Sequence, residues 1–370
     1  MTFIHILKGQ PRYLTQYYSV IVGSNNFLSL KKFANQEGVN FINIPMYRKI
    51  NPIYDIYSIV ILVFKILKLK PDLVHSYTPK AGFVCAISCY ITRVPIRIHT
   101  FTGLIFPYKK NPMKLLLAKI DSIICRLNTH IIAEGAGVKK QLIDNKITSQ
   151  PINIIGNGNI VGVDTAYYKP KIYIKGFSRV EFLKNLNITE KTLIFIFAGR
   201  LNRDKGITEL LEAYIKLNKK DICLLLIGEF ETRIFKNKVM SLINSSNNLI
   251  HIEGWKSDIR PYLDLSDCFV LPSYREGFPN VLLQAGAMML PSIVTNVSGS
   301  NEIIKNNYNG WICNSKSVIE LVNLMNFVIS MPKVKLVEHG VNARHCIKEN
   351  YEQCDYRNNL VKFYKGLNDD

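Results

Sequence analysis

The chain has 370 residues, 48% of them hydrophobic, so it is long enough for two globular domains and too apolar to be disordered. Lysine and arginine number 47 against 28 aspartates and glutamates, and the net charge of +19 favours an anionic partner: nucleic acid, a membrane surface or a phosphorylated small molecule. No stretch reaches the roughly 20 apolar residues of a spanning helix, and no cleavable signal is visible.

The beginning of the chain is irregular for an α/β domain. Lys8–Leu14 already reads as a first helix, and only Thr2–Leu7 precedes it. Either Thr2–Leu7 is a short stub of the first strand or that strand is missing. A misplaced start codon is the alternative explanation. A missing central strand would leave its neighbours with unpaired backbone groups, so we expect the first domain to be the less stable one.

Short apolar runs then alternate with helical patterns in two series. The first series of expected strands is Tyr18–Val22, Leu73–His75, Ile96–His99, His130–Ala133 and Ile152–Ile155. The second is Leu193–Phe197, Leu224–Ile227, Leu249–Ile252, Cys268–Leu271 and Ser292–Thr295. Strands of this length between helices indicate parallel βαβ units, and two series predict two doubly wound α/β domains.

The domain boundaries follow from composition. A linker rich in Gly, Asn, Tyr and Pro covers 157–175, so the first domain is expected over 1–170 and the second over 171–335. The last segment, 336–370, is expected to return to the first domain through a final helix, Tyr351–Leu367. The apolar run Ile53–Leu67, interrupted by charged and polar residues, predicts a helix buried on most sides. A ligand is expected between the domains, at the carboxyl ends of the strands.

The segment Ser273–Ala285 follows the buried strand Cys268–Leu271 and leads into an apolar helix, for which Pro279 suits the first position. Its turn directs backbone N–H groups and the positive end of a helix above the strand, which is the geometry of a phosphate site. Glu276 lies on the lip of this turn, as a ligand contact or as a carboxylate that stabilises the helix N-terminus. Gln284 lies about two turns further on, on a face that a nucleoside could reach.

A second loop carries two cations at the same edge of the sheet. Arg200 ends a strand, and Lys205 precedes Gly206 and a helix that starts near Thr208. Because both loops follow strands of one parallel sheet, these cations should face the turn around Glu276. The alternative is that Arg200 and Lys205 belong to a solvent-exposed basic loop that binds no ligand. Further along, Glu302 is expected to cap its own helix.

In the first domain, polar side chains follow several strand ends. His99 is expected at the carboxyl end of a strand, with Thr102 and Gly103 in the turn that follows, although a lone histidine is more often structural. Lys80 heads a helix whose N-terminus would suit a phosphate group, and a tight packing turn is the alternative. The weaker candidates at two further strand ends are Glu134 and Asn157.

The pair Glu276 and Gln284, with Arg200 and Lys205 upstream, resembles the signature of the family 4 retaining glycosyltransferases, enzymes of GT-B architecture. The resemblance implies two Rossmann-like domains that face each other across a cleft. In that family a second glutamate stands where this chain has Gln284. A neutral amide still accepts a hydrogen bond but loses the charge-assisted part, on the order of 1 kcal/mol.

The resemblance also implies roles for single residues. It assigns the donor diphosphate to Arg200, Lys205, Phe278 and Asn280. Glu276 would contact the donor sugar or phosphate, Gln284 would hold the ribose, and His99 would contact the donor sugar and orient the reacting centre. The cleft would also be lined on the acceptor side by Lys80, Thr102, Gly103, Glu134 and Asn157.

Several first-domain segments resemble one bacterial branch of that family, which builds capsule, O-antigen and exopolysaccharide on a polyprenyl diphosphate carrier. These segments are Thr78–Gly82, Ile98–Gly103 and Glu134–Gly135 followed by Gly137–Lys140. The resemblance implies transfer of a hexose or N-acetylhexosamine from a UDP-sugar to a lipid-linked saccharide. The chain is expected to be cytoplasmic and to sit peripherally on the anionic inner face of the cytoplasmic membrane.

Other classes of partner lack a sequence signal. No helix-turn-helix, RRM or basic arm favours nucleic acid, and no Asp-x-Asp motif follows a strand, so neither a metal nor another cofactor is expected. The eight cysteines contain no C-x-x-C pair and read as buried free thiols. Two rival interpretations remain: a degenerate paralogue that binds nucleotide without turnover, favoured by the short start and Gln284, and a GT-B sugar-nucleotide epimerase.

Overall fold

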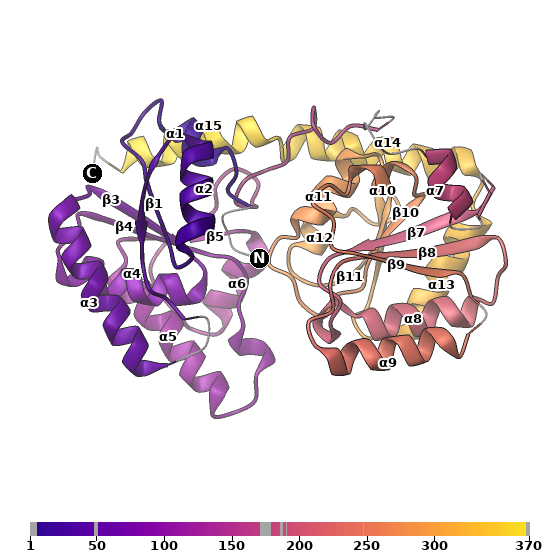
Figure 1. Cartoon of the computed structure of the whole chain (residues 1–370), viewed down its shortest axis with the longest axis horizontal. Coiled ribbons are helices and arrows are strands. Elements are labelled where there is room, and N and C mark those ends of the chain that lie inside the picture. The colour runs from indigo at the N-terminus through magenta and orange to yellow at the C-terminus, as the bar shows by residue number, and fades with distance from the viewer. Residues whose placement is uncertain are drawn as a thin grey trace. The chain divides into compact units, whose positions relative to one another are not determined.

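The computed structural model describes residues 6–47, 51–170, 179–185, 188–189, 191–246 and 248–367. The chain folds into two compact α/β units (Figure 1), one of Met1–Val161 with Cys354–Asp370 and one of Gly162–Gln353. All eight cysteines lie in the described ranges and are free thiols, most of them buried, as expected.

The boundaries between the units differ from the expected ones. The first unit ends at Val161 instead of 170, because the following segment is tied to the second unit. Val163 exchanges backbone hydrogen bonds with Tyr351 and Gln353, and Arg344 donates to the carbonyl oxygens of Thr165 and Tyr168. Residues 336–353 were expected in the first unit and belong to the second, since helix α14 (Lys333–Asn350) packs on α11 (Asn280–Ala287).

The second unit contains one parallel sheet of six strands in the order β12-β11-β10-β7-β8-β9. The strands are β7 (Leu193–Ala198), β8 (Ile222–Ile227), β9 (Ile250–Gly254), β10 (Cys268–Leu271), β11 (Ser292–Thr295) and β12 (Gly310–Cys313). Each residue of β8 and β10 is buried, as expected for strands that helices cover on both faces. The predicted strands are confirmed, and only β12 lacks a sequence prediction.

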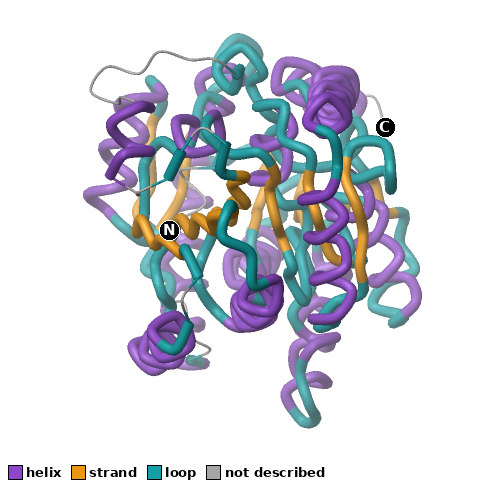
Figure 2. The backbone as a smooth tube through the Cα atoms, turned by 90° about the vertical axis from the view of Figure 1, so that its right-hand side faces the viewer, coloured by secondary structure: helices purple, strands orange, loops and turns teal. Residues whose placement is uncertain are grey.

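Helices flank this sheet, as Figure 2 shows from the side of the second unit. They are α7 (Arg179–Asn185), α8 (Ile207–Leu217), α9 (Arg233–Asn244), α10 (Arg260–Asp264), α11, α12 (Ser300–Ile303), α13 (Val318–Ser330) and α14. Because α8 to α13 each follow a strand of this parallel sheet, the strand-to-helix loops all lie at the carboxyl edge. That edge holds most of the candidate donor residues.

The first unit has two parallel sheets instead of one. β1 (Ile21–Ser24) pairs with β2 (Asn40–Asn43), and a second sheet has the order β3-β4-β5-β6. Its strands are β3 (Leu73–Tyr77), β4 (Ile96–Phe101), β5 (His130–Ala133) and β6 (Ile152–Asn153). In the described ranges no strand joins β1 to β3. Most of the expected segment, Thr2–His5, lies outside the described residues.

Helix α1 (Gln10–Leu14) connects the two sheets through side-chain contacts. The backbone N–H groups of Gly9 and Arg12 donate to the Glu37 carboxylate at the end of α2 (Phe27–Glu37). Gln10 reaches Tyr77 of β3 at 3.4 Å. The remaining helices are α3 (Pro52–Leu69), α4 (Pro79–Ile91), α5 (Met113–Leu127), α6 (Ala136–Asp144) and α15 (Gln353–Gly366), which returns to this unit.

The expectation that the Ile53–Leu67 helix is buried on most sides is wrong. Helix α3 buries Leu62 and Ile66 against α4 and β2, but the apolar side chains on its other face are exposed. Within the described ranges, no helix combines the length and hydropathy that crossing a bilayer requires.

Candidate functional site

The loop after β7 is held in one shape by its own backbone contacts. Asn202 caps the short 3-10 turn Arg203–Lys205 by accepting a hydrogen bond from the Lys205 N–H at 3.0 Å. Gly206 ends the turn with φ +67°, and a Cβ there would lie 2.0 Å from the Pro272 carbonyl oxygen. This close approach needs glycine, and it places the loop directly against the end of β10.

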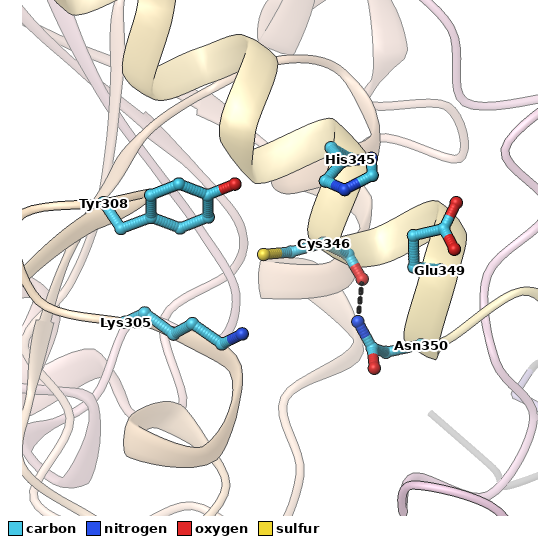
Figure 3. Close-up of a pocket in the computed structure, with 6 residues that line it drawn as sticks. All are labelled: Lys305, Tyr308, His345, Cys346, Glu349 and Asn350. Carbon is cyan, nitrogen blue, oxygen red and sulfur yellow. Dashed lines mark hydrogen bonds between the residues drawn. The ribbon is translucent and has the colours of Figure 1, made fainter.

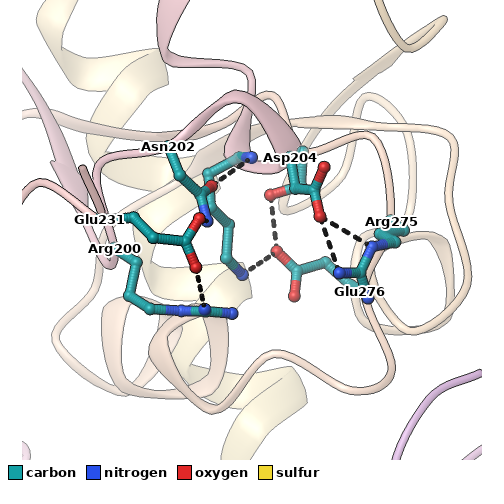
Figure 4. Close-up of polar contacts among 8 residues, drawn as sticks. Arg200, Asn202, Asp204, Glu231, Arg275 and Glu276 are labelled. Atoms are coloured by element: carbon teal, nitrogen blue, oxygen red, sulfur yellow. Dashed lines mark hydrogen bonds and ion pairs between the residues drawn. The ribbon is translucent and has the colours of Figure 1, made fainter. Parts of the chain in front are cut away.

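The contact predicted between the two loops is present as an ion pair (Figure 4). Lys205 Nζ lies 2.5 Å from Glu276 Oε1, and the Ser273 hydroxyl donates to the same oxygen at 2.6 Å. The side chains of Lys205 and Glu276 are 19% and 9% exposed. Because burial weakens solvent screening, this pair orients both groups.

Arg200 is placed more loosely. Its Nη1 lies 3.1 Å from Glu231 Oε1, and both side chains are about half exposed. Asn202 Nδ2 donates to the other Glu231 oxygen at 3.0 Å. Glu231 was missing from the sequence prediction, although it follows β8 and therefore lies at the same edge of the sheet. An anion that binds Arg200 would either bind beside the Glu231 carboxylate or displace it from the guanidinium group.

A second ion pair fastens the same two loops. Arg275 Nη2 lies 2.7 Å from Asp204 Oδ2, and the Tyr274 N–H donates to the Asp204 carbonyl oxygen at 2.8 Å. The Tyr274 hydroxyl also donates to Glu209 of α8. Sequence reasoning missed these three contacts, because no sequence pattern shows which side chains of the two loops pair with each other. They keep the two cation-bearing loops in register.

The turn before α11 differs in detail from the expectation. Pro279 is the N-cap residue and Asn280 begins the helix, one position later than predicted. Phe278 is buried with its ring 5.5 Å from that of Tyr351, so its side chain stabilises the turn, and only its backbone is available to a diphosphate. Gln284 is half-buried on the same helix.

The loop after β11 closes this edge of the sheet. Gly299 has φ +75°, and a Cβ there would lie 2.1 Å from the Gly277 carbonyl oxygen. Glu302 Oε1 accepts the Gly299 N–H at 3.0 Å, which confirms that this carboxylate caps its own helix. The buried hydroxyls of Ser298 and Ser300 find no hydrogen-bond partner among the described residues. Such hydroxyls are suited to a polar ligand.

In the first unit, His99 does not lie at the end of its strand, contrary to expectation. β4 continues to Phe101, and the His99 ring is 1% exposed, 2.9 Å from the Ser76 hydroxyl. Burial lowers the pKa of His99 to about 3, so its ring is neutral at physiological pH. In this position His99 does not reach the surface, and its contact with a donor sugar stays a prediction.

The other first-unit candidates follow the carboxyl ends of adjacent strands. Lys80 Nζ lies 2.6 Å from the Asp55 carboxylate of α3, so its charge is already partly balanced. Thr102 and Gly103 follow β4, and Glu134 follows β5 with a buried side chain. Asn157 is exposed beyond β6. The order β3-β4-β5-β6 therefore brings these residues to one edge of the sheet.

A cavity of about 320 Å³ lies elsewhere in the second unit, between α14 and the loop after α12 (Figure 3). It is lined by Lys305, Tyr308, His345, Cys346, Glu349 and Asn350. None of these residues follows one of the strands that carry the convergent cations. The candidate site is therefore the carboxyl edge of the β7, β8, β10 and β11 loops and not this cavity. Within the described ranges, no cluster of histidine, cysteine and acidic side chains has the geometry of a metal site.

Two family matches cover most of the chain. Residues 16–161 match Glycosyltransferase Family 4, and residues 178–353 match Glycosyl transferases group 1. The chain is 30% identical over 294 residues to the UDP-Gal:alpha-D-GlcNAc-diphosphoundecaprenol alpha-1,3-galactosyltransferase of Escherichia coli, covering 78% of this chain and 72% of that protein. It is 29% identical over 320 residues to the capsular polysaccharide biosynthesis glycosyltransferase CapM of Staphylococcus aureus, covering 84% and 80%.

Solved structures share the fold at low sequence identity. Anabaena HepE in complex with UDP-glucose superposes with a TM-score of 0.81 at 17% identity, over 98% of this chain and 96% of that one. A glycosyltransferase from Rickettsia africae superposes with a TM-score of 0.77 at 22% identity, over 98% and 94%. Two parallel-sheet units of this kind constitute the GT-B fold.

Proposed function

The chain belongs to the family 4 glycosyltransferases, and from that premise we propose that it moves a hexose or N-acetylhexosamine from a UDP-sugar to a polyprenyl-diphosphate-linked saccharide. The single observation that carries the donor half is the convergence of the Lys205, Arg200 and Glu276 loops at one sheet edge. The relative from Escherichia coli acts, by its name, on a sugar-diphosphoundecaprenol, which supports the acceptor half. The relative CapM acts, by its name, in capsular polysaccharide biosynthesis, which supports a role in the synthesis of surface polysaccharide.

The donor would be held by charge and by hydrogen bonds. Lys205 and Arg200 are positioned for the diphosphate, together with the backbone N–H groups at the start of α11. Glu276 would contact the donor sugar and Gln284 the ribose hydroxyls. Binding requires Lys205 to divide its charge between Glu276 and the incoming phosphate, so the ion pair of the unliganded site pre-orients the ammonium group.

The reaction would proceed with retention of the anomeric configuration. The acceptor hydroxyl oxygen forms a bond to the anomeric carbon on the face from which the diphosphate departs, and the bond from that carbon to the phosphate oxygen breaks. The hydroxyl proton passes to the departing phosphate oxygen, which yields UDP. The protein contributes positioning and stabilisation of the negative charge on the leaving group.

The proposal includes transfer without a divalent metal, because Lys205 and Arg200 offer fixed positive charge to the diphosphate. Activity should therefore persist in excess EDTA, measured as UDP release in the presence of acceptor. Activity that EDTA abolishes and magnesium or manganese restores would contradict this part of the proposal and leave glycosyl transfer itself intact.

A screen of UDP- and GDP-sugars for thermal stabilisation, followed by donor turnover with and without a lipid extract, tests the function. We expect UDP-sugars to raise the melting temperature through mass action and sugar transfer to require the extract. Stabilisation without turnover would indicate a non-catalytic nucleotide-binding paralogue. Conversion of the donor without any acceptor would indicate an epimerase, and the absence of any nucleotide effect would contradict the donor site.

A further inference from the structure

Helix α3 of the first unit presents an apolar stripe to solvent. Ile53, Ile56 and Phe64 are 79%, 62% and 65% exposed. The spacing of the exposed side chains places them on one side of the helix, because residues three, four or seven positions apart share a helical face. The stripe consists of Ile53, Ile56, Tyr57, Val60, Phe64 and Leu67.

The opposite face of α3 is partly polar and points into the protein. Asp55 forms the ion pair with Lys80 at 2.6 Å, and the Ser58 hydroxyl donates to the Tyr54 carbonyl oxygen at 2.7 Å. An ordinary surface helix has polar side chains on its outer face, whereas α3 exposes apolar ones there. Since Leu62 and Ile66 already provide the buried apolar contacts of α3, packing within the unit does not explain the apolar side chains on its exposed face.

Aromatic rings lie at the start of the stripe. Tyr47 and Tyr54 are both exposed, with their ring centroids 4.4 Å apart. Helix α3 packs on α4, and α4 packs on α5, so the three helices form one layer. Other exposed apolar side chains in this layer are Tyr90 and Ile91 of α4 and Met113, Leu115 and Leu116 of α5. Tyrosine next to aliphatic residues is typical of a surface that meets the polar boundary of a bilayer.

The charge of the layer is strongly positive. Between Pro52 and Arg126 the sequence has eleven lysines and arginines and three aspartates. Of these aspartates, Asp55 and Asp121 are buried. The exposed cations include Lys68, Lys70, Arg93, Lys109, Lys110 and Lys119. A second copy of the same layer would bring like charges together, whereas an anionic lipid surface is complementary.

We propose that α3 lies in the plane of an anionic bilayer surface, with its apolar stripe among the lipid headgroups and acyl chains and the surrounding cations on the lipid phosphates. An amphipathic helix that lies in the interface needs neither the length nor the hydropathy of a spanning helix. The role of this membrane contact rests on the proposed function, in which the acceptor is linked to a lipid. The Asp55–Lys80 pair joins the inner face of α3 to the turn after β3, so a bound α3 holds the acceptor-side edge of the sheet near lipid-linked acceptors.

The test is co-sedimentation of the full chain with vesicles of phosphatidylethanolamine and phosphatidylglycerol, and with phosphatidylcholine vesicles. The wild-type chain should bind the anionic vesicles and bind phosphatidylcholine far less. The double variant Ile56→Ser, Phe64→Ser should lose about tenfold or more of this binding. The matched control, Ile234→Ser with Ile319→Ser, removes two even more exposed apolar side chains from the second unit and should bind as the wild type does.

An unchanged unfolding midpoint by circular dichroism confirms that each variant is folded in both units, and light scattering reports its oligomeric state. Equal vesicle binding by the stripe variant and the wild type would overturn the inference, as would absence of binding to anionic vesicles. A dimer that the stripe variant dissociates, without change in vesicle binding, would assign the face to a second copy instead. Transfer to a short-chain, water-soluble acceptor tests the proposed function separately, since it requires no bilayer.

Discussion

At the scale of single residues, the two candidate diphosphate cations differ in burial. Lys205 is held by Glu276 in a mostly buried pair, whereas Arg200 and Glu231 are half exposed. Screening by solvent therefore reduces the contribution of Arg200 more strongly than that of Lys205. The two cations should not be equivalent in donor binding.

We expect Lys205→Ala to weaken UDP binding by about 1.5–3 kcal/mol and Arg200→Ala by about 1 kcal/mol, measured by calorimetry. Lys205→Ala should also lower the stability of the second unit by about 3 kcal/mol, because it leaves the Glu276 carboxylate buried without its cation. Lys335→Ala removes a highly exposed lysine of α14 and serves as the control. Unchanged UDP affinity in both site variants would contradict the assignment of this loop.

Buried histidines make the first unit sensitive to acid. Burial lowers the pKa of His99 to about 3, and burial, together with the electrostatic effect of protonating the neighbouring His99, lowers the pKa of His75 to about 3. The unfolded chain binds a proton at each site near pH 6.5, and the folded unit does not. Stability is therefore complete above about pH 7.5 and falls as the pH drops, by on the order of 2 kcal/mol for His99 at pH 5.

Tryptophan fluorescence and circular dichroism can separate the units, since Trp255 and Trp311 both lie in the second one. Between pH 7.5 and 5, the denaturant midpoint seen by circular dichroism should fall more than that seen by fluorescence. Burial raises the pKa of Asp121 to about 7, so this carboxyl opposes the histidines by taking up a proton in the folded state. Asp121→Asn should therefore enlarge the acid effect, and an identical pH profile in wild type and variant would contradict this balance.

At the scale of elements, the site depends on loops whose backbones touch. Gly299 lies in the loop after β11, and Gly277 lies in the loop after β10. A Cβ at Gly299 would be 2.1 Å from the Gly277 carbonyl oxygen. A side chain at Gly299 would therefore push the two loops apart in addition to straining the positive φ.

We expect Gly299→Ala to destabilise the second unit by about 3 kcal/mol or more and to remove UDP binding. Gly254→Ala is the matched control, since Gly254 also has a positive φ, of +67°, but has open space where the Cβ would be. The Gly254→Ala variant should lose only about 1 kcal/mol of unfolding free energy. The denaturant midpoint of tryptophan fluorescence measures the loss in both variants. Similar losses in the two variants would show that loop contact contributes nothing beyond the backbone strain.

At the scale of the whole molecule, the two units differ in how their sheets are completed. The second unit has six strands in one sheet, while the described part of the first unit has its strands in two sheets that share no backbone ladder. β1 and β3 each present one edge without a strand partner among the described residues. Edge strands exchange amide protons more readily than central ones because fewer contacts must open.

Peptide-resolved hydrogen exchange should therefore show early exchange in β1 and β3, relative to β4 and to β7 and β8 of the second unit. The first unit should also unfold at lower denaturant than the second. Protection of β1 and β3 equal to that of β4 would show that another segment completes the sheet in solution.

Much of the candidate donor site was predictable from sequence because it follows a local rule. Parallel strands place their carboxyl ends at one edge, so Arg200, Lys205 and Glu276 could be brought together without coordinates. Glu231 obeys the same rule but carried no motif, and the Arg275–Asp204 pair became visible only in the structure. The burial of His99 was also missed, because the end of a strand is set by pairing and not by the residue that follows it.

The amino-acid sequence by itself determined the two series of βαβ units, the cation-bearing loops and the resemblance that implies glycosyl transfer, because hydrophobic periodicity and short motifs are local properties. Only the tertiary structure decided that α14 packs on the second unit, that Arg275 pairs with Asp204, and that the apolar side of α3 faces solvent. The sequence pattern of an apolar helix is the same whether its apolar face packs on a core or is exposed to solvent. The choice depends on what the rest of the chain places against it, which is a property of the packed molecule.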